Sequence, residues 1–579
     1  MDDIVTLKID GTAVQVQKGT TVLEAAKLVG VQIPTLCFLK GINQPSGCRV
    51  CLVEAGPKLL SSCSLIAQEN MDIKTNTKKV REARKTIVEL ILSNHREECT
   101  ICSRSGHCEL QTLASDLHVH SLRYQGKRTR KPLDDVSPSL VRDAEKCVLC
   151  GRCIAVCSDV QTVSAIGLIN RGFETVIGPA FGRSMGESVC VNCGQCIMVC
   201  PVGALTEREQ MDEVWDAIAN PDKVVIVQTA PAVRVALGEE FGMEIGTRVT
   251  GKMVNALRMI GFDRVFDTDF GADLTIMEEG TELIRRLQSG ENLPLMTSCC
   301  PGWVKFVEHN FPDMINHLSS CKSPHEMEGA MIKSYFANKM GIAPQNIVTV
   351  SIMPCIAKKF EQQREELSHE GMQDVDYVLT TRELASMIKQ AGIDFVHLPD
   401  DQFDDPFGQS SGAGVIFGAT GGVAEAALRT VYEVLAGEEL DKVDYTLVRG
   451  LEGIKESELL LPNGMLLRTA VVHGLANARK VMQMIQRGEK SYHFIEVMAC
   501  PGGCIAGGGQ PIVKSNFREQ VDVKALRAKA IYAEDKDMPV RKSHKNPDII
   551  RVYEEFLGEP NSHISHELLH THYLQRARH

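Results

Sequence analysis

The cysteines of this chain are unevenly spread and closely spaced. Fifteen of the 21 lie from Cys37 to Cys200, many of them with two other residues between neighbouring cysteines. The other six are scattered over the rest of the 579 residues. Such spacings are typical of iron–sulfur clusters, which are held by thiolates from short loops. An odd number of cysteines without a secretory signal argues against disulfides. We therefore expect a cytoplasmic protein that transfers electrons through several clusters.

The composition limits the class of protein further. A length of 579 residues is too great for one hydrophobic core and predicts several domains. The net charge of −11 argues against nucleic acid as a partner, since phosphate binding needs a basic surface. The acidic, alternating N-terminus is not a signal peptide, and no apolar stretch approaches the ~20 residues that span a bilayer. We expect no membrane anchor.

Residues 1–79 predict a small ferredoxin-like domain. Residues 4–27 indicate two short strands around the turn Asp10-Gly11 and then a helix capped at Thr21. The following loop has the cysteine spacing C-x10-C-x2-C-x11-C, at Cys37, Cys48, Cys51 and Cys63. Plant-type two-iron ferredoxins have a shorter first gap but also use three loop cysteines and one distant cysteine. The segment resembles the β-grasp 2Fe-2S module of large redox enzymes, which implies one 2Fe-2S cluster.

Residues 80–125 hold a second ligand pattern, H-x3-C-x2-C-x5-C, at His95, Cys99, Cys102 and Cys108. A helix over residues 77–96 would place His95 and Cys99 on one face of its end. The spacing alone fits a histidine ligand and an ordinary surface histidine equally well. The motif resembles that of hydrogenases and of the large iron–sulfur subunit of respiratory complex I. That resemblance implies that His95 and the three thiolates bind a 4Fe-4S cluster.

Residues 126–209 contain an internal repeat with an offset of 43 residues. Each half reads C-x2-C-x2-C-x3-C, the pattern of two-cluster bacterial ferredoxins, in which the fourth cysteine of each half crosses to the other cluster. One 4Fe-4S cluster is therefore assigned to Cys147, Cys150, Cys153 and Cys200, and the other to Cys157, Cys190, Cys193 and Cys196. The first half has Ser158 where the usual proline stands, which alters a turn and not a ligand.

Residues 210–579 predict a large α/β domain in two lobes. Strand-like runs at residues 224–227 and 346–352 alternate with helical stretches such as the one framed by Gly251 and Gly261. Residues 395–412 read as a surface loop.

Three segments of this domain carry cysteines that a packing argument does not explain. They read TSCCPGW (297–303), MPCIAKKFE (353–361) and MACPGGCIAGGGQP (498–511). Glycine lets backbone approach a bulky inorganic group closely. A lone buried cysteine is usually a small hydrophobe, but four beside glycines and prolines favour a buried metal centre built from distant elements.

The three motifs resemble those of the iron-only, or FeFe, hydrogenases, and the resemblance covers the whole chain, including the four-cluster N-terminal half of the long monomeric clostridial type. It implies an H-cluster, a 4Fe-4S cubane joined through one thiolate to a two-iron unit with CO, CN and dithiolate ligands. The implied cubane ligands are Cys300, Cys355, Cys500 and Cys504, with Cys504 shared by the two-iron unit.

The resemblance also implies the surroundings of the two-iron unit. Lys358 would donate to a cyanide, and a cation opposite an anionic ligand is electrostatically favourable. The thioethers of Met353 and Met498 and the ring of Phe417 would form an apolar wall, although core packing explains the methionines almost as well. Pro231 and Ala232 lie where the family contacts a cyanide. Alanine at 232 lacks the serine hydroxyl sometimes found there, which leaves backbone donors.

A proton path is implied in the same way. Cys299 is not needed as a ligand, and a thiol pKa near 8.5 suits proton exchange at neutral pH. Glu279 and Glu282 are three residues apart on one expected helix face, and Ser319 and Arg286 would complete the relay. Without the resemblance, a solvated acidic turn would be the simpler explanation for the two glutamates. Cys321 is expected to be structural.

The sequence thus predicts a monomeric enzyme that reversibly reduces protons to H2. Electrons would come from ferredoxin or flavodoxin through one 2Fe-2S and three accessory 4Fe-4S clusters, and maturation proteins would deliver the two-iron unit. An iron–sulfur subunit of an NADH or formate dehydrogenase would share the first 210 residues but would lack the motifs at 297–361. Two alternatives stay open: the catalytic subunit of an electron-bifurcating complex, and a non-catalytic relative that senses H2 or assembles clusters.

Overall fold

The N-terminal segment forms a small mixed sheet. The computed structural model describes residues 4–437, 439, 443–461 and 464–577. Strands β1 (Ile4–Ile9) and β2 (Thr12–Gln17) form a hairpin whose turn residues, Asp10 and Gly11, have φ values of 48° and 89°. The strand order is β2-β1-β5-β3-β4, with β3 (Leu52–Ala55), β4 (Lys58–Ser61) and β5 (Asp72–Lys74). The Thr21 side chain caps α1 (Val22–Leu28). The predicted hairpin and capped helix are confirmed.

The second segment departs from the expected helix geometry. Helix α2 (Lys78–Asn94) ends one residue before His95, whose backbone is extended with φ −81° and ψ 141°. Cys99 begins a separate 3₁₀ turn that spans Cys99–Ile101, and α3 (Glu109–Asp116) follows. The prediction that His95 and Cys99 share one helix face is therefore wrong. The chain turns between them, so tertiary structure brings the two side chains to their positions.

The cysteine repeat is also a repeat of backbone conformation. In the first half, Leu149 and Gly151 have φ values of 52° and 78°, and the short helix α4 (Arg152–Ala155) follows them. In the second half, Asn192 and Gly194 have φ values of 58° and 70°, and the short helix α5 (Gln195–Val199) follows them. Two small antiparallel sheets of two strands complete this part: β6 (Leu140–Arg142) with β9 (Leu205–Glu207), and β7 (Gly167–Ile169) with β8 (Val176–Gly178).

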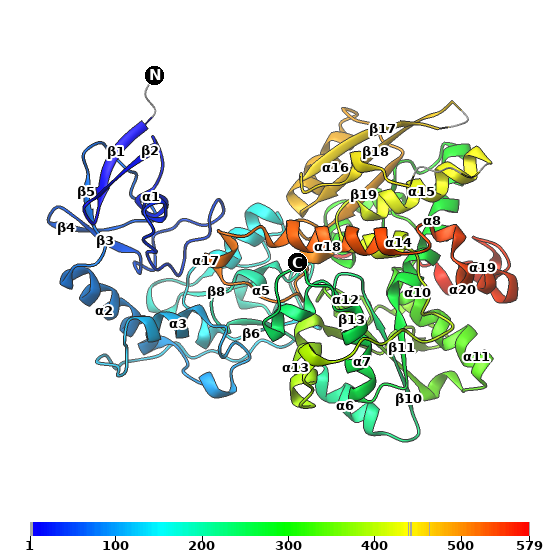
Figure 1. Ribbon diagram of the computed structural model, residues 1–579, viewed down its shortest axis with the longest axis horizontal. Coiled ribbons are helices and arrows are strands. Elements are labelled where there is room, and N and C mark those ends of the chain that lie inside the picture. Colours follow the sequence, from blue (N-terminus) through cyan, green and yellow to red (C-terminus); the bar gives the residue numbers. More distant parts are fainter. Residues whose placement is uncertain (1–3, 438, 440–442, 462–463, 578–579) are drawn as a thin grey trace.

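The rest of the chain forms two lobes, each built on a four-stranded sheet. The first sheet is wholly parallel, in the order β11-β10-β13-β16: β11 (Arg264–Asp267), β10 (Val224–Thr229), β13 (Ile347–Met353) and β16 (Tyr377–Thr380). The second has the order β12-β19-β18-β17: β12 (Leu295–Met296), β19 (Phe494–Met498), β18 (Leu466–His473) and the antiparallel edge strand β17 (Ile454–Leu460). The predicted two-lobed α/β domain is confirmed (Figure 1).

Helices cover both faces of the first sheet, which explains its continuous apolar strands. Val225 and Val227 pack on α6 (Met211–Ala219), α7 (Thr250–Ile260) and α13 (Thr381–Gln390). Ile226 points to the other face, toward α8 (Thr268–Ser289) and α10 (Pro324–Met331). Side chains thus alternate between two cores along one buried strand.

The second sheet is covered in the same way. Val472 and Val497 pack on α9 (Pro301–Asn310) and α16 (Leu475–Gln486). Val471 packs toward α15 (Gly422–Ala436) on the opposite face. The remaining helices are α11 (Ala337–Met340), α12 (Lys358–Glu361), α14 (Gly412–Val415), α17 (Ser515–Arg518), α18 (Val523–Asp537), α19 (Pro547–Val552) and α20 (His563–Leu569); β14 (Ser368–His369) and β15 (Met372–Gln373) form a small ladder.

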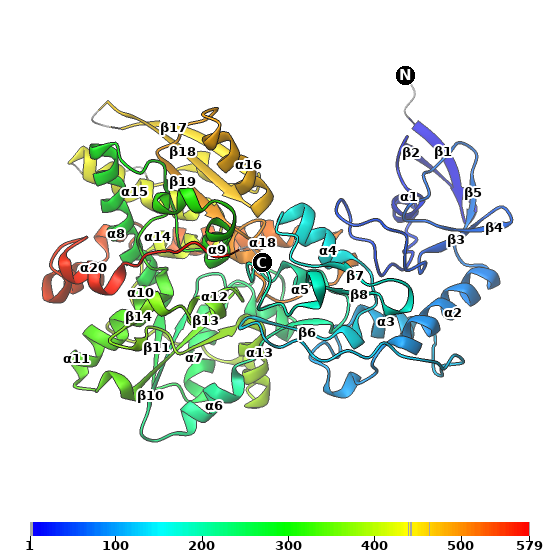
Figure 2. The same ribbon diagram turned by 180° about the vertical axis from the view of Figure 1, so that it is seen from behind.

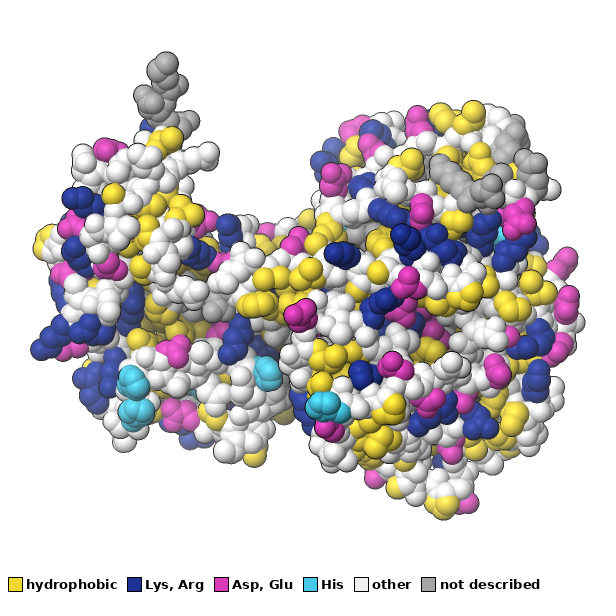
Figure 3. Space-filling view, viewed as in Figure 1, with side chains coloured by type: hydrophobic (Ala, Val, Ile, Leu, Met, Phe, Trp, Pro, Cys, Tyr) yellow, Lys and Arg dark blue, Asp and Glu magenta, His cyan; other side chains and the backbone are white. Residues whose placement is uncertain are grey.

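The cysteine-repeat segment lies between the small N-terminal sheet and the two lobes, as both ribbon views show (Figures 1 and 2). The space-filling view shows a waist at this place (Figure 3). Residues 395–412 are only partly a surface loop, because Phe407 is fully buried and Ser411 caps α14. No helix among the described residues is long and apolar enough to cross a membrane.

Candidate active site and electron-transfer path

The three cysteine motifs of the large domain follow the carboxyl ends of parallel strands. Cys299 and Cys300 come after β12, Cys355 comes after β13, and Cys500 comes after β19. Ligand sites in α/β proteins lie at this end of a sheet because the loops there converge. The two lobes each contribute, β13 from one sheet and β12 and β19 from the other. The candidate site therefore lies between the lobes.

Four thiols meet at this place. Burial and, to a smaller extent, the charge of the neighbouring Cys300 raise the pKa of Cys355 to about 12. Burial also raises the pKa of Cys500, with contributions from the charges of Cys355, Cys300 and Cys504. The backbone N–H of Ala499 donates to the Sγ atom of Cys300 at 3.4 Å. Four converging thiols with raised pKa values become stable thiolates when they bind a metal centre, so this donor set fits an iron–sulfur cubane.

The glycine run after Cys504 packs closely against other parts of the chain. A Cβ atom at Gly507 would lie 2.1 Å from the carbonyl oxygen of Pro354, and one at Gly508 would lie 2.7 Å from that of Cys193. These glycines therefore allow close approach of other backbone segments. At Gly503, where φ is +92°, a Cβ atom would lie 2.6 Å from the backbone nitrogen of Thr420. The run joins the motifs to one another and to the cysteine repeat.

Lys358 lies beside the cysteine pair. Its Nζ atom donates to the carbonyl oxygen of Cys299 at 3.2 Å and to the Oε2 atom of Glu361 at 2.6 Å. Although burial opposes its charge, the Glu361 carboxylate outweighs this effect and raises the pKa of Lys358. Lys358 thus remains a cation at the site.

The expected apolar wall residues come from both lobes. Met353 ends β13 and belongs to the core of the first sheet, and Met498 ends β19 and belongs to the core of the second. Phe417 and Ala232 are buried in the same core as Met498. The Ala232 carbonyl oxygen accepts a hydrogen bond from Gln510 at 2.8 Å, which ties the Pro231-Ala232 segment to the third motif.

The expected relay residues lie along α8 and the segment before α10. The Ser319 hydroxyl donates to Glu282 Oε2 at 2.8 Å, and Arg286 pairs with Glu282 at 2.5 Å. Burial and, to a smaller extent, the charge of Glu282 raise the pKa of Glu279 to about 8. The Oε2 atom of Glu279 is buried without a hydrogen-bond partner among the described residues. Burial, and next the charge of Glu279, raise the pKa of Cys299, so these two groups lie near each other.

Arg286 closes the far end of this row. It is only 13% exposed and donates to the carbonyl oxygens of Asn292 and Leu318 at 2.9 and 3.0 Å. Cys321, expected to be structural, is fully buried with its Sγ atom 4.0 Å from Glu282. Its place beside the relay was missed, since a lone cysteine gives no spacing signal.

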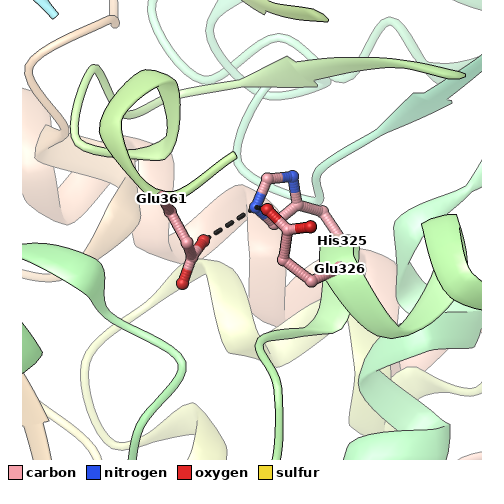
Figure 4. Close-up of side chains that lie close together, drawn as sticks. All are labelled: His325, Glu326 and Glu361. Atoms are coloured by element: carbon pink, nitrogen blue, oxygen red, sulfur yellow. Dashed lines mark hydrogen bonds and ion pairs between the residues drawn. The ribbon is translucent and has the colours of Figure 1, made fainter. Parts of the chain in front are cut away.

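A buried group of one histidine and two glutamates lies next to Lys358 and was not predicted from the sequence. His325 and Glu326 lie on α10, and Glu361 ends α12 (Figure 4). Glu361 is the last residue of the MPCIAKKFE motif, and its spacing of three from Lys358 was the signal that could have revealed the pair.

Two cavities separate the eight repeat cysteines into the expected groups. One is lined by Cys147, Cys150, Cys153 and Cys200, and the other by Cys157, Cys190, Cys193 and Cys196. Burial raises the pKa of Cys147 to about 11 and that of Cys157 to about 11. Each cavity therefore offers four thiols, which fits one cubane.

The N-terminal ligand candidates are also gathered. The thiols of Cys37 and Cys48 interact with each other, as do those of Cys51 and Cys63. The Nδ1 atom of His95 is buried without a hydrogen-bond partner among the described residues, which fits a ring nitrogen reserved for a metal. A Cβ atom at Gly203 would lie 2.7 Å from the Sγ atom of Cys102, so only glycine leaves room there.

Hydrogen bonds connect the N-terminal cysteine groups to the cysteine repeat. Asn43 donates to the carbonyl oxygens of Cys37 and Cys150, at 2.8 and 3.1 Å. Arg104 donates to the carbonyl oxygen of Cys200 at 3.1 Å. Both N-terminal groups therefore contact the first repeat group. The second repeat group approaches the catalytic thiols at Cys193.

Together these features define an iron–sulfur oxidoreductase with a chain of accessory sites leading to a buried metal centre. Family models match the chain along its length: the iron only hydrogenase large subunit, C-terminal domain (223–508), the iron hydrogenase small subunit (521–576), a 2Fe-2S binding domain (2–78), the NADH-ubiquinone oxidoreductase-G iron–sulfur binding region (84–123) and the ferredoxin-like domain of NADH-quinone oxidoreductase subunit 3 (137–206).

Individual relatives agree with these matches. The chain is 51% identical to the NADP-reducing hydrogenase subunit HndD of Solidesulfovibrio fructosivorans, over 99% of this chain and 100% of the relative. It is 43% identical to iron hydrogenase 1 of Clostridium pasteurianum, over 98% and 99% of the two chains. A solved point variant of the apo-hydrogenase HydA1 of Chlamydomonas reinhardtii aligns with a TM-score of 0.57 at 43% identity, over 63% of this chain and 98% of that one.

The chain therefore belongs to the iron-only (FeFe) hydrogenases and is an enzyme of H2 turnover. Its N-terminal half consists of 2Fe-2S and 4Fe-4S binding domains, and its C-terminal half is the domain that holds the H-cluster in this family.

Proposed function

We propose that the chain reversibly combines two protons and two electrons to H2 at a site held by Cys300, Cys355, Cys500 and Cys504. The convergence of these four thiols from three separate strand ends carries the proposal. When bound, the six-iron cofactor supplies the redox chemistry. Dedicated maturation proteins would deliver its two-iron unit.

Protons move through side chains of this chain. Cys299 is the terminal donor, and its partner across the buried gap is Glu279, which is protonated at neutral pH because its pKa is about 8. Ser319 and Glu282 continue the row through a 2.8 Å hydrogen bond, and Arg286 holds Glu282 at its outer end. Met353, Met498 and Phe417 exclude water from the site, and Pro231, Ala232 and Lys358 line its polar side.

Electrons follow the row of accessory groups. We assign residues 1–79 to a 2Fe-2S domain, 80–125 to a 4Fe-4S domain with one histidine and three cysteine ligands, 126–209 to two 4Fe-4S clusters and 210–579 to catalysis. The contacts of Asn43 and Arg104 support two branches that meet at the group of Cys150 and Cys200. From there the path leads through the group of Cys193 to Cys500.

A small acidic carrier in the cytoplasm, such as ferredoxin or flavodoxin, is the proposed electron partner. Residues 121–131 carry five basic residues and no acidic one. This stretch is tied to the end of α2, because Thr129 donates its N–H to the Asn94 side chain at 2.7 Å. It therefore lies beside His95. A basic surface next to a cluster attracts an acidic carrier by electrostatic steering.

Infrared spectroscopy of active, fully matured protein tests the site directly. We expect bands of metal-bound carbon monoxide and cyanide, and their absence from active protein would disprove the proposal. The variant Cys299→Ala should keep its clusters and lose most of its turnover, by about 10²–10⁴-fold for a lost acid–base group. Near-native H2 evolution by this variant would remove Cys299 from its role.

A second candidate is the hydrogenase subunit of a larger NADP-linked complex. The 51% identity to HndD, a subunit of an NADP-reducing hydrogenase, over nearly the whole chain favours it. The isolated chain would then evolve H2 from a reduced artificial dye but would not reduce NADP⁺ with H2. The native mass of the protein after gentle purification distinguishes a monomer from a subunit that co-purifies with other subunits.

A further inference from the structure

Four buried ionisable side chains form a cluster that includes Lys358, whose Nζ atom also contacts the Cys299 carbonyl oxygen. His325 and Glu326 are 1% and 0% exposed, and Lys358 and Glu361 are 8% and 5% exposed. The first two lie on α10, and the other two begin and end α12. Figure 4 shows that His325 and Glu361 point toward each other from these two helices, with Glu326 beside them.

The Oε2 atom of Glu361 is the centre of this cluster. It accepts hydrogen bonds from Lys358 Nζ at 2.6 Å, from His325 Nε2 at 2.7 Å and from Ser323 Oγ at 3.0 Å. The Nε2 atom of His325 also lies 3.2 Å from the Oε1 atom of Glu326. One carboxylate oxygen thus fixes the ammonium group of Lys358 and is itself fixed by the imidazole.

The carboxylates of Glu326 and Glu361 both lie close to the Nε2 atom of His325, at 3.2 and 2.7 Å. Burial and the charge of Lys358 oppose protonation, but the two carboxylates outweigh them and raise the pKa of His325. In the same way the pKa of Glu361 is lowered to about 2, since Lys358 and His325 overcome the effect of burial. The Nε2 atom of His325 thus lies between the two carboxylates as an N–H donor.

We propose that His325 is a positioning residue for Lys358: its Nε2–H holds the Glu361 carboxylate, which aims the Lys358 ammonium group at the active site. The inference rests on the proposed function, in which Lys358 faces the anionic ligands of the two-iron unit. Without His325, the described residues leave Glu361 the hydroxyl of Ser323 as its donor beside Lys358. The ammonium group then loses its fixed direction, because a lysine side chain has four rotatable bonds.

The same three residues could be considered as a metal site. Ligand atoms of His325, Glu326 and Glu361 lie within 4.8 Å of one another. The ammonium group of Lys358 is 2.6 Å from the Glu361 oxygen that the ion would need, and it would repel a divalent cation. An N–H at His325 Nε2 occupies the place between the two carboxylates without this repulsion.

The experiment compares His325→Leu with His325→Gln in fully matured protein. Leucine removes the donor, whereas the glutamine amide keeps an N–H that reaches Glu361. We expect the leucine variant to shift the infrared band of metal-bound cyanide and to lose about 10- to 100-fold of its H2 turnover, the value of a hydrogen bond to a charged group. The glutamine variant should restore the wild-type band and most of the turnover.

A matched control is His544→Gln, because His544 also pairs with a buried carboxylate, Glu433, at 3.0 Å but lies on another element. It should leave the cyanide band unchanged. If the leucine variant fails to fold, His325→Asn replaces it, since its amide is one methylene shorter and falls short of Glu361. The same band shift and loss are expected for it.

Three outcomes would overturn the inference. They are a wild-type cyanide band in the folded leucine or asparagine variant, a glutamine variant that behaves like the leucine variant, and loss of a stoichiometric non-iron metal when His325 is replaced. Failure of the proposed function is distinguishable from all three, because the wild-type protein itself would then lack the cyanide bands.

Discussion

The Sγ atom of Cys500 lies 4.0 Å from the backbone carbonyl oxygen of Cys193. Cys500 belongs to the third cysteine motif of the large domain, and Cys193 belongs to the second half of the cysteine repeat, 307 residues earlier. The contact is between the second repeat group and the thiols of the proposed active site. The glycines that follow Cys504 permit it, because Gly508 packs directly on the backbone of Cys193 and Gly194.

This junction should not tolerate a side chain at residue 508. In Gly508→Ala the new Cβ atom would lie 2.7 Å from both the Cys193 oxygen and the Gly194 Cα atom. We expect a destabilisation of about 1–3 kcal/mol, typical of overpacking, and slower electron delivery at normal iron content. Thermal melting and H2 evolution measure the two effects. Gly126→Ala is the control, since no atom lies within 4 Å of its Cβ position. A wild-type melting temperature for Gly508→Ala would contradict the prediction.

Neighbouring serines offer a matched test of the proton path. Ser319 donates to Glu282 at 2.8 Å, whereas the hydroxyl of Ser320 contacts the His570 ring at 2.8 Å. Ser319→Ala should lower H2 turnover by at least about tenfold, short of the roughly 10²–10⁴-fold of a lost acid–base group. Ser320→Ala should leave turnover near wild type. Equal activities for the two variants, measured in a dye-coupled H2 assay, would exclude this route.

The pH dependence of stability should report on Glu279. Burial raises its pKa from 4.5 to about 8, so the folded state binds this proton more tightly than the unfolded state does. Its contribution to stability is therefore fully present below pH 4.5 and is lost as the pH rises to about 8. The variant Glu279→Gln should remove this loss, so its melting temperature should fall less between pH 5 and 8 than that of the wild type. Parallel melting curves over this range would show that Glu279 is not protonated at neutral pH.

Removal of the His95 side chain should release one accessory cluster. Its buried Nδ1 atom lacks a hydrogen-bond partner among the described residues, and three thiols stand nearby in the sequence. We expect iron to fall from roughly twenty atoms per chain by about four in His95→Ala, given clusters of two, four and six irons. His107→Ala, at an exposed histidine of the same segment, should keep its iron. Full iron content in His95→Ala would assign the fourth ligand elsewhere.

The sequence alone determined the parts of this protein that depend on local spacing. The repeat of Cys147–Cys157 and Cys190–Cys200 indicated two crossed ligand groups, and the two cavities have the same composition. Iron–sulfur ligands in one loop are close in sequence because they must be close in space. The hairpin at Asp10-Gly11 and the strand at β13 were predictable for the same reason, since turn residues and apolar runs act locally.

The contacts between segments that are far apart in the sequence depend on the tertiary structure. It placed three motifs at strand ends of two sheets, Cys321 beside Glu282, and His325 against Glu361. It also showed that His95 does not share a helix face with Cys99, and that the glycine run packs against protein backbone. These relationships join residues that are tens to hundreds of positions apart. They arise from the packing of helices on sheets and from the pairing of buried charges, and no spacing in the sequence records them.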